Sequence, residues 1–387
     1  MEMQECRAES TAPIARRVLV SGASFAGLAT AYWMNRLGFQ VTVIEVASGL
    51  RKGGTPVDIE GETIDILARM GMIDAVRAKA LPPRGFEFQN ADDSTVGTMG
   101  TQSDPDGVPS ERYEIHRADL LDILFASVAE AVEVSFGKSI KHLEDRPDQV
   151  AVTFSDGSSS DYALVFGCDG NRSNTRRLTF GEDDFSFFMG GYFFIKVVPI
   201  TTLLPANTSQ IFSVPGRTAL LNGYDDQTDV AFAFRTEREI EYAYRDREPQ
   251  CRLIHDHFSN LGWKVPAMLE HVDADEEFYF DKLNQIRMPA WSKGRVTLVG
   301  DAGYCVSPLA GMGGSMAIIG AARVADAMRC HGDDYAAAFE EYEEKLRPFV
   351  EEVQQKAVSF GMTMMFPADD VELAERDRKI SAGILDV

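Results

Sequence analysis

The stretch RVLVSGASFAGLAT, residues 17–30, decides the first part of the fold. Residues 18–20 are apolar and predict a short buried strand, residues 25–37 predict a helix, and residues 41–44 predict a second strand. A strand, helix and strand within about 30 residues present a helix N-terminus to a phosphate. The dinucleotide-binding fingerprint of such a unit has glycine where this chain has Ser24.

The turn between strand and helix fits a nucleotide in spite of that serine. Gly22 permits the tight bend, and Gly27 lets the helix pack closely on the strand. Ser24 adds only a hydroxymethyl group, and its hydroxyl can point toward phosphate oxygens. Glu45, at the end of the second strand, can accept hydrogen bonds from ribose hydroxyls. The alternative is a structural strand–helix turn without a ligand.

Charge and cysteine usage exclude several classes of function. The 387 residues carry 38 Lys and Arg against 60 Asp and Glu, a formal net charge of −22. Because phosphate backbones are bound by basic surfaces, we expect no nucleic acid partner. The cysteines number 5 and form no C-x-x-C pair, so a disulfide framework or zinc site is not expected. We expect His255 and His257 to lie on a helix surface, and we expect no metal site.

Targeting signals are also not expected. The first residues are polar and lack the apolar core of a secretory signal. No stretch approaches the roughly 18 apolar residues of a membrane span. We therefore expect a cytoplasmic protein without a membrane span.

Two further motifs follow along the chain. In CDGNRSNTR, residues 168–176, Asp169 and its glycine form a pattern that alone is more typical of a turn. In GRVTLVGDAGYCVSPLAGMGGSMAIIGA, residues 294–321, a buried strand ends in Gly300 and Asp301, and a glycine-rich segment opens another helix. A carboxylate and a helix start at one strand end offer a hydroxyl acceptor and an anion site.

Between these motifs the chain is aromatic and rich in β signals. Segments such as MGGYFFIKVVPI, residues 189–200, and DVAFAFRT, residues 229–236, predict an antiparallel sheet inserted between nucleotide-binding pieces. Ligand pockets favour domain interfaces with apolar walls. Our candidates for a substrate pocket are Phe193, Phe232, Phe234 and Arg235. Alternating aromatic residues on a strand are, however, more often plain core.

The three motifs, in this order and at this spacing, resemble the signatures of the FAD-dependent aromatic hydroxylases, the class A flavoprotein monooxygenases. The resemblance covers about residues 15–350. Within that class, RKGGTPVDIEG, residues 51–61, and SPLAGMGGSMAIIGA, residues 307–321, are most similar to the tetracycline-inactivating monooxygenases.

The resemblance implies an α/β fold in three parts. A discontinuous, Rossmann-like FAD-binding domain is expected over residues 15–75, 105–185 and 280–340. A substrate-binding domain with the inserted mixed or antiparallel β-sheet is expected over residues 76–104 and 186–279. A C-terminal helical segment is expected over residues 341–387.

The resemblance also implies a resident FAD and the residues that hold it. They are Gly22, Ser24, Phe25, Ala26, Glu45, Arg51, Lys52, Arg117, Ile140, Asp169, Gly300, Asp301, Pro308, Gly311, Gly313, Gly314, Ser315 and Met316. The turn at Gly22 would hold the pyrophosphate, Glu45 the adenosine ribose and Asp301 the ribityl chain. Residues 308–316 would surround the ribityl and isoalloxazine end, and the Ile140 backbone would contact adenine.

The implied reaction needs no protein nucleophile. NADPH or NADH, bound transiently because the chain has one Rossmann-like turn, would reduce FAD. Oxygen would add to the reduced flavin, and the C4a-hydroperoxide would hydroxylate an electron-rich aromatic, phenolic or enolic molecule. A tetracycline-like polyketide is one such candidate. The expected partners are thus a small-molecule substrate and O₂. The sequence does not indicate whether the protein is a monomer or an oligomer.

Other functions are also compatible with the sequence. One alternative is an FAD-dependent dehydrogenase or reductase without oxygen insertion, and another is a non-catalytic FAD-binding module. A flavin-dependent halogenase is disfavoured because its W-x-W-x-I-P signature is missing. The tryptophans, Trp33, Trp263 and Trp291, form no such pair.

Overall fold

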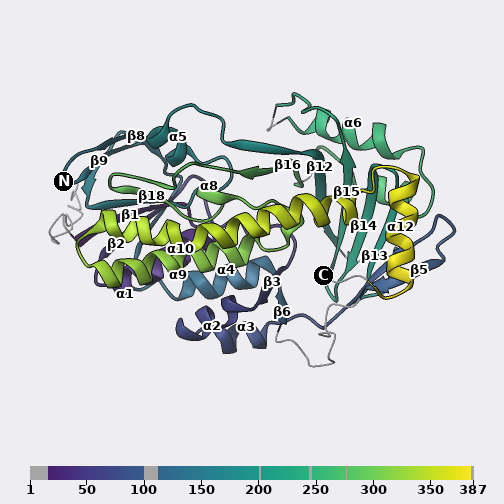
Figure 1. Cartoon of the computed structure of the whole chain (residues 1–387), viewed down its shortest axis with the longest axis horizontal. Helices are drawn as coiled ribbons and strands as arrows, with labels where there is room; N and C mark the ends of the chain where they lie inside the picture. Colours follow the sequence, from purple (N-terminus) through teal and green to yellow (C-terminus); the bar gives the residue numbers. More distant parts are fainter. Residues whose placement is uncertain (1–15, 100–111, 200–201, 244–245, 276, 385–387) are drawn as a thin grey trace, which may run out of the picture.

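The chain folds as a mixed α/β protein with one β-sheet toward each end of its long axis (Figure 1). In this computed structural model the described residues are 16–99, 112–199, 202–243, 246–275 and 277–384. The expected domain ranges also include positions 15, 100–111, 200–201, 244–245, 276 and 385–387, which lie outside the described residues.

The first sheet has six strands in the order β17-β18-β11-β1-β2-β7, and only the edge strand β17 is antiparallel to its neighbour. These strands are β1 (Arg17–Ser21), β2 (Gln40–Glu45), β7 (Glu133–Phe136), β11 (Leu164–Gly167), β17 (Ser292–Lys293) and β18 (Val296–Leu298). The expected strand, helix and strand of residues 17–45 are confirmed, with α1 (Phe25–Arg36) between β1 and β2.

Both faces of this sheet are covered, which explains why its strands read as continuous apolar runs. Val18 and Val20 pack in one core with α1, α9 (Gly313–His331) and α10 (Tyr335–Lys356). Leu19 points to the other face and packs on a three-stranded sheet. That sheet consists of β8 (Ile140–Asp145), β9 (Val150–Phe154) and β10 (Ser159–Tyr162).

The second sheet has seven strands in the order β16-β12-β15-β14-β13-β4-β5, with one parallel pair, β13 and β4. Its strands are β4 (Phe86–Gln89), β5 (Thr95–Met99), β12 (Ser186–Pro199), β13 (Ser209–Val214), β14 (Arg217–Gly223), β15 (Gln227–Arg235) and β16 (Tyr279–Ile286). The expected mixed sheet is therefore present. The helices α6 (Arg247–Phe258) and α7 (Val265–Leu269) pack on one of its faces.

The C-terminal segment packs on the other face of the second sheet. After α10 come a π-helical turn, η3 (Ala357–Gly361), then α11 (Met362–Met365) and α12 (Asp370–Ser381). Met362 and Phe366 pack there on Ala233 and Leu283. In Figure 1 this segment runs in yellow from the helices of the first sheet to the far end of the second.

The remaining elements include helices that pack in the first core, such as α2 (Glu62–Arg69) and α4 (Arg117–Ala126). The others are the paired strands β3 (Val57–Glu60) and β6 (Arg112–Ile115), the helices α3 (Ile73–Ala78), α5 (Asn174–Phe180) and α8 (Asp301–Tyr304), and the 3₁₀ turn η2 (Pro308–Ala310). Of these, α5 begins within the second sequence motif and α8 lies within the third.

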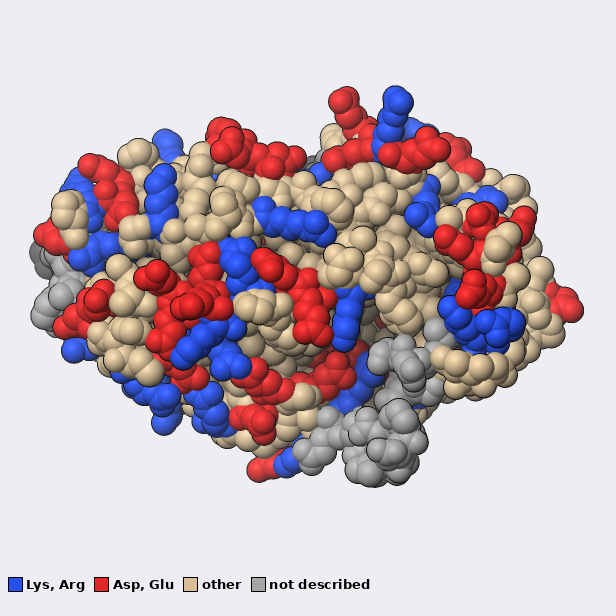
Figure 2. Space-filling view, viewed as in Figure 1, with Lys and Arg blue, Asp and Glu red and all other residues tan. Residues whose placement is uncertain are grey.

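The acidity of the chain is visible on its surface. Figure 2 shows acidic side chains gathered over the region of α9 and α10, with basic side chains between them. Some of these pair at helical spacing, as Lys345 does with Glu341 and Arg347 with Glu343. Among the described residues, no helix is both long and apolar enough to cross a bilayer.

Candidate functional site

The turn between β1 and α1 requires glycine at two positions and not at the third. Gly22 has a φ of +111°, and a Cβ there would lie 2.3 Å from the carbonyl oxygen of Cys168. A Cβ on Gly27 would lie 1.8 Å from the carbonyl oxygen of Gly22. Ser24 has φ −102° and ψ −165°, an extended conformation open to any residue. The serine therefore does not distort the turn.

Ser24 also leaves the start of α1 uncapped. Its side chain makes no cap hydrogen bond, and its Oγ accepts instead from Nη2 of Arg117 at 2.9 Å. The first amide groups of a helix have no intrahelical partner and carry its positive dipole end. A phosphate group fits such a site, because amide donors and a guanidinium lie at one helix end.

Glu45 closes the same turn from the end of β2. Its Oε2 accepts from the Ala23 amide at 3.0 Å, and its Oε1 accepts from the Ala47 amide at 2.9 Å. The Arg51 Nε lies 4.0 Å from Glu45 Oε1, while 67% of the Arg51 side chain is exposed. The carboxylate is thus held at the strand end, and Arg51 lies at the rim.

Arg117 joins the first motif to the third. Its guanidinium lies 4.5 Å from the ring centroid of Phe25. Burial lowers the pKa of Arg117, and the charge of Asp301 opposes this. Burial likewise raises the pKa of Asp301, opposed by the charge of Arg117. Gly300 brings Asp301 close to α1, since a Cβ on Gly300 would lie 3.0 Å from the Cβ of Ala26.

Asp169 shapes the second motif through its own turn. Its Oδ2 accepts from the amide of Thr175 at 2.9 Å and from the Thr175 hydroxyl at 2.8 Å, and its Oδ1 accepts from the Ser173 hydroxyl. Arg176 extends from this turn and donates to the carbonyl oxygen of Ala302 at 2.8 Å. The second motif therefore braces the loop that carries Asp301.

The glycine-rich segment follows at the start of α9. Pro308 opens η2, and Gly311 ends it with a φ of +68°. Ser315 donates to the carbonyl oxygen of Asp58 at 3.0 Å, and Met316 is buried in the first core. Gly313 and Gly314 form the first turn of α9. The segment thus lies against β3 and closes the site formed by α1 and α8.

Lys52 and Ile140 lie at the edges of this arrangement. The Lys52 ammonium bonds to Asp122 of α4 at 2.8 Å and is half exposed. Ile140 begins β8 with a buried side chain, and its carbonyl oxygen accepts from the side-chain Nδ2 of Asn174 at 2.7 Å. The carbonyl oxygen and the side chain of Ile140 therefore both have partners within the protein.

The substrate-pocket candidates fall on opposite faces of the second sheet. Phe232 and Phe234 are buried under α6, with ring centroids 4.7 Å from Phe258 and 3.8 Å from His257, respectively. They are core residues, and His257 is half-buried rather than on the surface as we expected. Because residues alternate along a strand, only the other two candidates share the opposite face.

That opposite face meets the C-terminal segment. Phe193 is half-buried there beside Met362 and Phe366. Arg235 donates from Nη1 to the carbonyl oxygen of Phe366 at 3.1 Å. These two side chains lie where the second sheet, η2 and the C-terminal segment come together.

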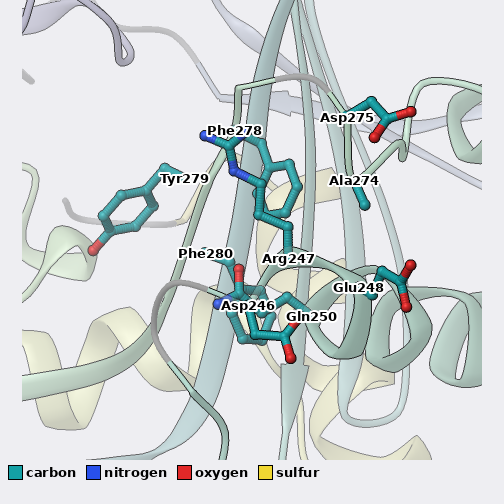
Figure 3. Close-up of a pocket in the computed structure, with 9 residues that line it drawn as sticks. All are labelled: Asp246, Arg247, Glu248, Gln250, Ala274, Asp275, Phe278, Tyr279 and Phe280. Atoms are coloured by element: carbon teal, nitrogen blue, oxygen red, sulfur yellow. The ribbon is translucent and has the colours of Figure 1, made fainter.

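A separate cavity of about 620 Å³ lies between the start of α6 and the start of β16 (Figure 3). Its lining residues are Asp246, Arg247, Glu248, Gln250, Ala274, Asp275, Phe278, Tyr279 and Phe280. Figure 3 shows Arg247 extending along Phe278, while Tyr279 points away from the α6 side chains. None of the motif residues lines this cavity. We therefore do not assign it as the FAD site.

Two residues within the quoted stretches have contacts or backbone angles that the sequence did not predict. Asp58 of β3 receives the Ser315 hydrogen bond on its carbonyl and pairs through its carboxylate with Arg112 at 2.8 Å. Ser307 has a φ of +81°, is 3% exposed, and its Oγ has no hydrogen-bond partner among the described residues. A backbone carbonyl contact and a strained serine carry no sequence signature.

Comparisons with known proteins agree with this geometry. A family model described as FAD binding domain matches residues 15–357. An uncharacterized protein of Mycobacterium tuberculosis is 38% identical over 347 residues, 88% of this chain and 92% of that protein. A flavin-dependent monooxygenase from an unknown prokaryotic organism is 33% identical over 383 residues, 96% of each chain.

Solved structures point the same way. The crystal structure of tetracycline destructase Tet(51) matches with a TM-score of 0.82 and 32% identity, covering 95% of this chain and 96% of that one. The described cradle fits FAD, since it joins an uncapped helix start, a guanidinium and two strand-end carboxylates. The chain therefore belongs to the class A flavin monooxygenases and is a flavin-dependent monooxygenase.

Proposed function

We propose that this chain uses NADPH or NADH and O₂ to hydroxylate a small electron-rich aromatic, phenolic or enolic molecule. The observation that carries the proposal is that Arg117 bonds to Ser24 of the first motif and interacts electrostatically with Asp301 of the third. Bound FAD supplies the redox and oxygen-transfer chemistry. The protein supplies the binding, the orientation and the exclusion of water.

The first and third motifs contact FAD in this proposal, and the second motif braces the loop that carries Asp301. Ser24, Arg117 and the start of α1 hold the pyrophosphate, Glu45 the adenosine ribose and Asp301 the ribityl chain. The turn at residues 308–316 contacts the flavin ring system. The FAD-binding domain then comprises the predicted ranges 15–75 and 105–185 and a third range that begins at 287 rather than at the predicted 280, because residues 280–286 belong to β16 of the second sheet.

The substrate pocket in this proposal lies on the face of the second sheet that carries Phe193 and Arg235. This face meets η2 and the C-terminal segment, so substrate and flavin would share a boundary formed by residues 308–316. The likeness to Tet(51), 32% identical over 95% of this chain, favours a tetracycline-like polyketide as the first compound to try.

The test begins with the purified protein loaded with FAD. Under anaerobic conditions, stopped-flow absorbance follows flavin reduction by NADPH and by NADH, with and without a tetracycline or a simple phenol. We expect reduction to accelerate when a substrate is present. On admission of heavy-isotope O₂, mass spectrometry should then find one labelled oxygen atom in the product.

The outcomes separate the alternatives. Reduction followed by a product without labelled oxygen would indicate a dehydrogenase or reductase. Bound FAD that neither nicotinamide reduces would indicate a binding module. Protein that takes up no FAD would contradict the proposal entirely.

Asp301→Ala tests the cofactor site itself. A hydrogen bond to a charged group contributes about 1.5–3 kcal/mol, so we expect the Kd for FAD to rise about 10–100-fold. Fluorescence titration of the apoprotein measures this constant. The matched control is Asp148→Ala, an exposed carboxylate between β8 and β9, which should leave the Kd unchanged. An unchanged Kd in Asp301→Ala would remove this residue from the site.

A further inference from the structure

Two buried glutamines hold the turn that precedes residues 308–316. Gln285 of β16 donates from Nε2 to the carbonyl oxygens of Val306 at 3.3 Å and of Gln354 at 2.8 Å. Gln354 of α10 donates from Nε2 to the carbonyl oxygens of Ile286 at 2.9 Å and of Cys305 at 3.0 Å. Their exposed fractions are 0% and 6%. Two consecutive carbonyls, of residues 305 and 306, are thus fixed by different elements.

The orientation of the Gln285 amide is itself determined. Its Oε1 accepts from Arg287 Nε at 3.0 Å and from Arg287 Nη2 at 2.7 Å. Because a guanidinium only donates, this oxygen cannot be exchanged with the amide nitrogen. The guanidinium in turn lies 3.7 Å from the ring centroid of Phe187. The donor side of Gln285 must therefore face Val306 and Gln354.

The residue next to these two carbonyls is strained. Ser307 has φ +81° and ψ +147°, a region that residues other than glycine rarely adopt. Such a conformation persists only where the surroundings fix it. Backbone hydrogen bonds fix part of this turn, since the Cys305 carbonyl accepts from the Ile286 amide at 3.0 Å and the Ser307 carbonyl from the Ala310 amide at 3.1 Å. The glutamine side chains add one hydrogen bond to each of the carbonyls of Cys305 and Val306, immediately before Ser307.

The helix that carries Gln354 also reaches the following turn. Beyond α10 the chain forms the π-helical turn η3, a conformation frequent at functional sites. A Cβ on Gly361 of this turn would lie 3.0 Å from the carbonyl oxygen of Leu309 in η2. The helix α10 and the turn η3 therefore contact the loop before and after Pro308, respectively.

We propose that Gln285 and Gln354 are positioning residues for the flavin. They hold residues 305–307 in one conformation, so that residues 308–316 present a fixed surface to the ring system of FAD. This inference rests on the proposed contact between residues 308–316 and the flavin. It gives α10 a role in setting the spectrum, midpoint potential and affinity of the flavin, in addition to its packing in the first core.

The test compares Gln354→Met with Gln355→Met. Methionine has a similar length but no amide, and Gln355 is exposed one residue further along the same helix. In FAD-loaded Gln354→Met we expect a changed visible absorption spectrum, a shifted flavin midpoint potential and about a tenfold rise in the Kd for FAD. The Gln355→Met protein should match the wild type in all three measurements.

A second variant keeps the proposal testable if Gln354→Met folds poorly. Glycine adopts the backbone angles of Ser307 without strain. In Ser307→Gly the turn should therefore keep its conformation without the hydrogen bonds from the two glutamines. We expect the double variant Gln354→Met, Ser307→Gly to regain melting temperature and FAD affinity relative to Gln354→Met. A double variant no better than Gln354→Met would overturn the proposal.

The remaining outcomes distinguish this proposal from the proposed function. If wild-type protein binds FAD and Gln354→Met has the same spectrum and midpoint potential, the positioning role is overturned while the monooxygenase stands. If wild-type protein and Gln355→Met both fail to bind FAD, the proposed function fails, and the inference fails with it.

Discussion

At Gly22 the backbone turns with a φ of +111° directly below the carbonyl oxygen of Cys168. Ser24, two residues on, has extended angles and faces Arg117. The two positions differ because a Cβ at position 22 would clash with neighbouring backbone and φ is positive there, whereas Ser24 has angles that any residue adopts. A glycine at position 24 would lose the acceptor for the Arg117 guanidinium, so the serine adds a contact and removes none.

Gly22→Ala tests this difference. The added Cβ would lie 2.3 Å from a backbone oxygen that cannot move aside easily. We expect the free energy of unfolding to fall by at least about 1–3 kcal/mol and FAD to be lost on gel filtration. Chemical denaturation and the flavin absorbance of the eluted protein measure the two effects. The control is Gly49→Ala, where a Cβ would meet nothing within 4 Å; equal stability of the two variants would contradict the argument.

At the scale of elements, periodicity predicted which strands exist but not which face each side chain joins. The run DVAFAFRT indicated β15, and the structure confirms the strand. Phe232 and Phe234 lie under α6, while Ala231 and Ala233 face the C-terminal segment side. Alternation assigns residues to two faces, and the elements that cover each face are set by packing between distant parts of the chain.

The candidate site was predictable to a similar extent. Glycines at a strand–helix turn and carboxylates at strand ends have sequence signatures, because local backbone geometry requires them. The hydrogen bonds of Gln285 and Gln354 join residues 21 to 69 positions apart, and neither residue belongs to a local pattern. Contacts of this kind follow from tertiary packing and become visible only in the folded structure.

At the scale of the whole molecule, a buried polar cluster joins the β3–β6 pair to the second sheet. Arg84 bonds to Glu114 of β6 and donates to the Tyr224 hydroxyl at 2.8 Å. That hydroxyl donates to Asp229 of β15 at 3.1 Å. Burial outweighs the nearby guanidinium and raises the pKa of Glu114 to about 7 and that of Asp229 to about 6.

This cluster makes the stability of the protein depend on pH. A carboxyl group whose pKa is higher in the folded state binds its proton more tightly there. Its contribution is therefore complete below the unfolded pKa, 4.5 for Glu114, and is lost as the pH rises through about 7. With 1.36 kcal/mol for each pKa unit, we expect Glu114 to lower the free energy of unfolding by about 1–3 kcal/mol between about pH 5 and about pH 8.

Glu114→Gln removes the titrating group while keeping its shape, so this variant should lose much less stability over the same range. The pH dependence of stability that remains in this variant comes from Asp229, whose pKa is also raised. Urea denaturation at several pH values measures the slopes for wild type, Glu114→Gln and the control Glu130→Gln, an exposed carboxylate after α4. The control should follow the wild type. Parallel curves for wild type and Glu114→Gln would show that Glu114 is ionised in the folded protein throughout, and that the ion pair with Arg84 outweighs its burial.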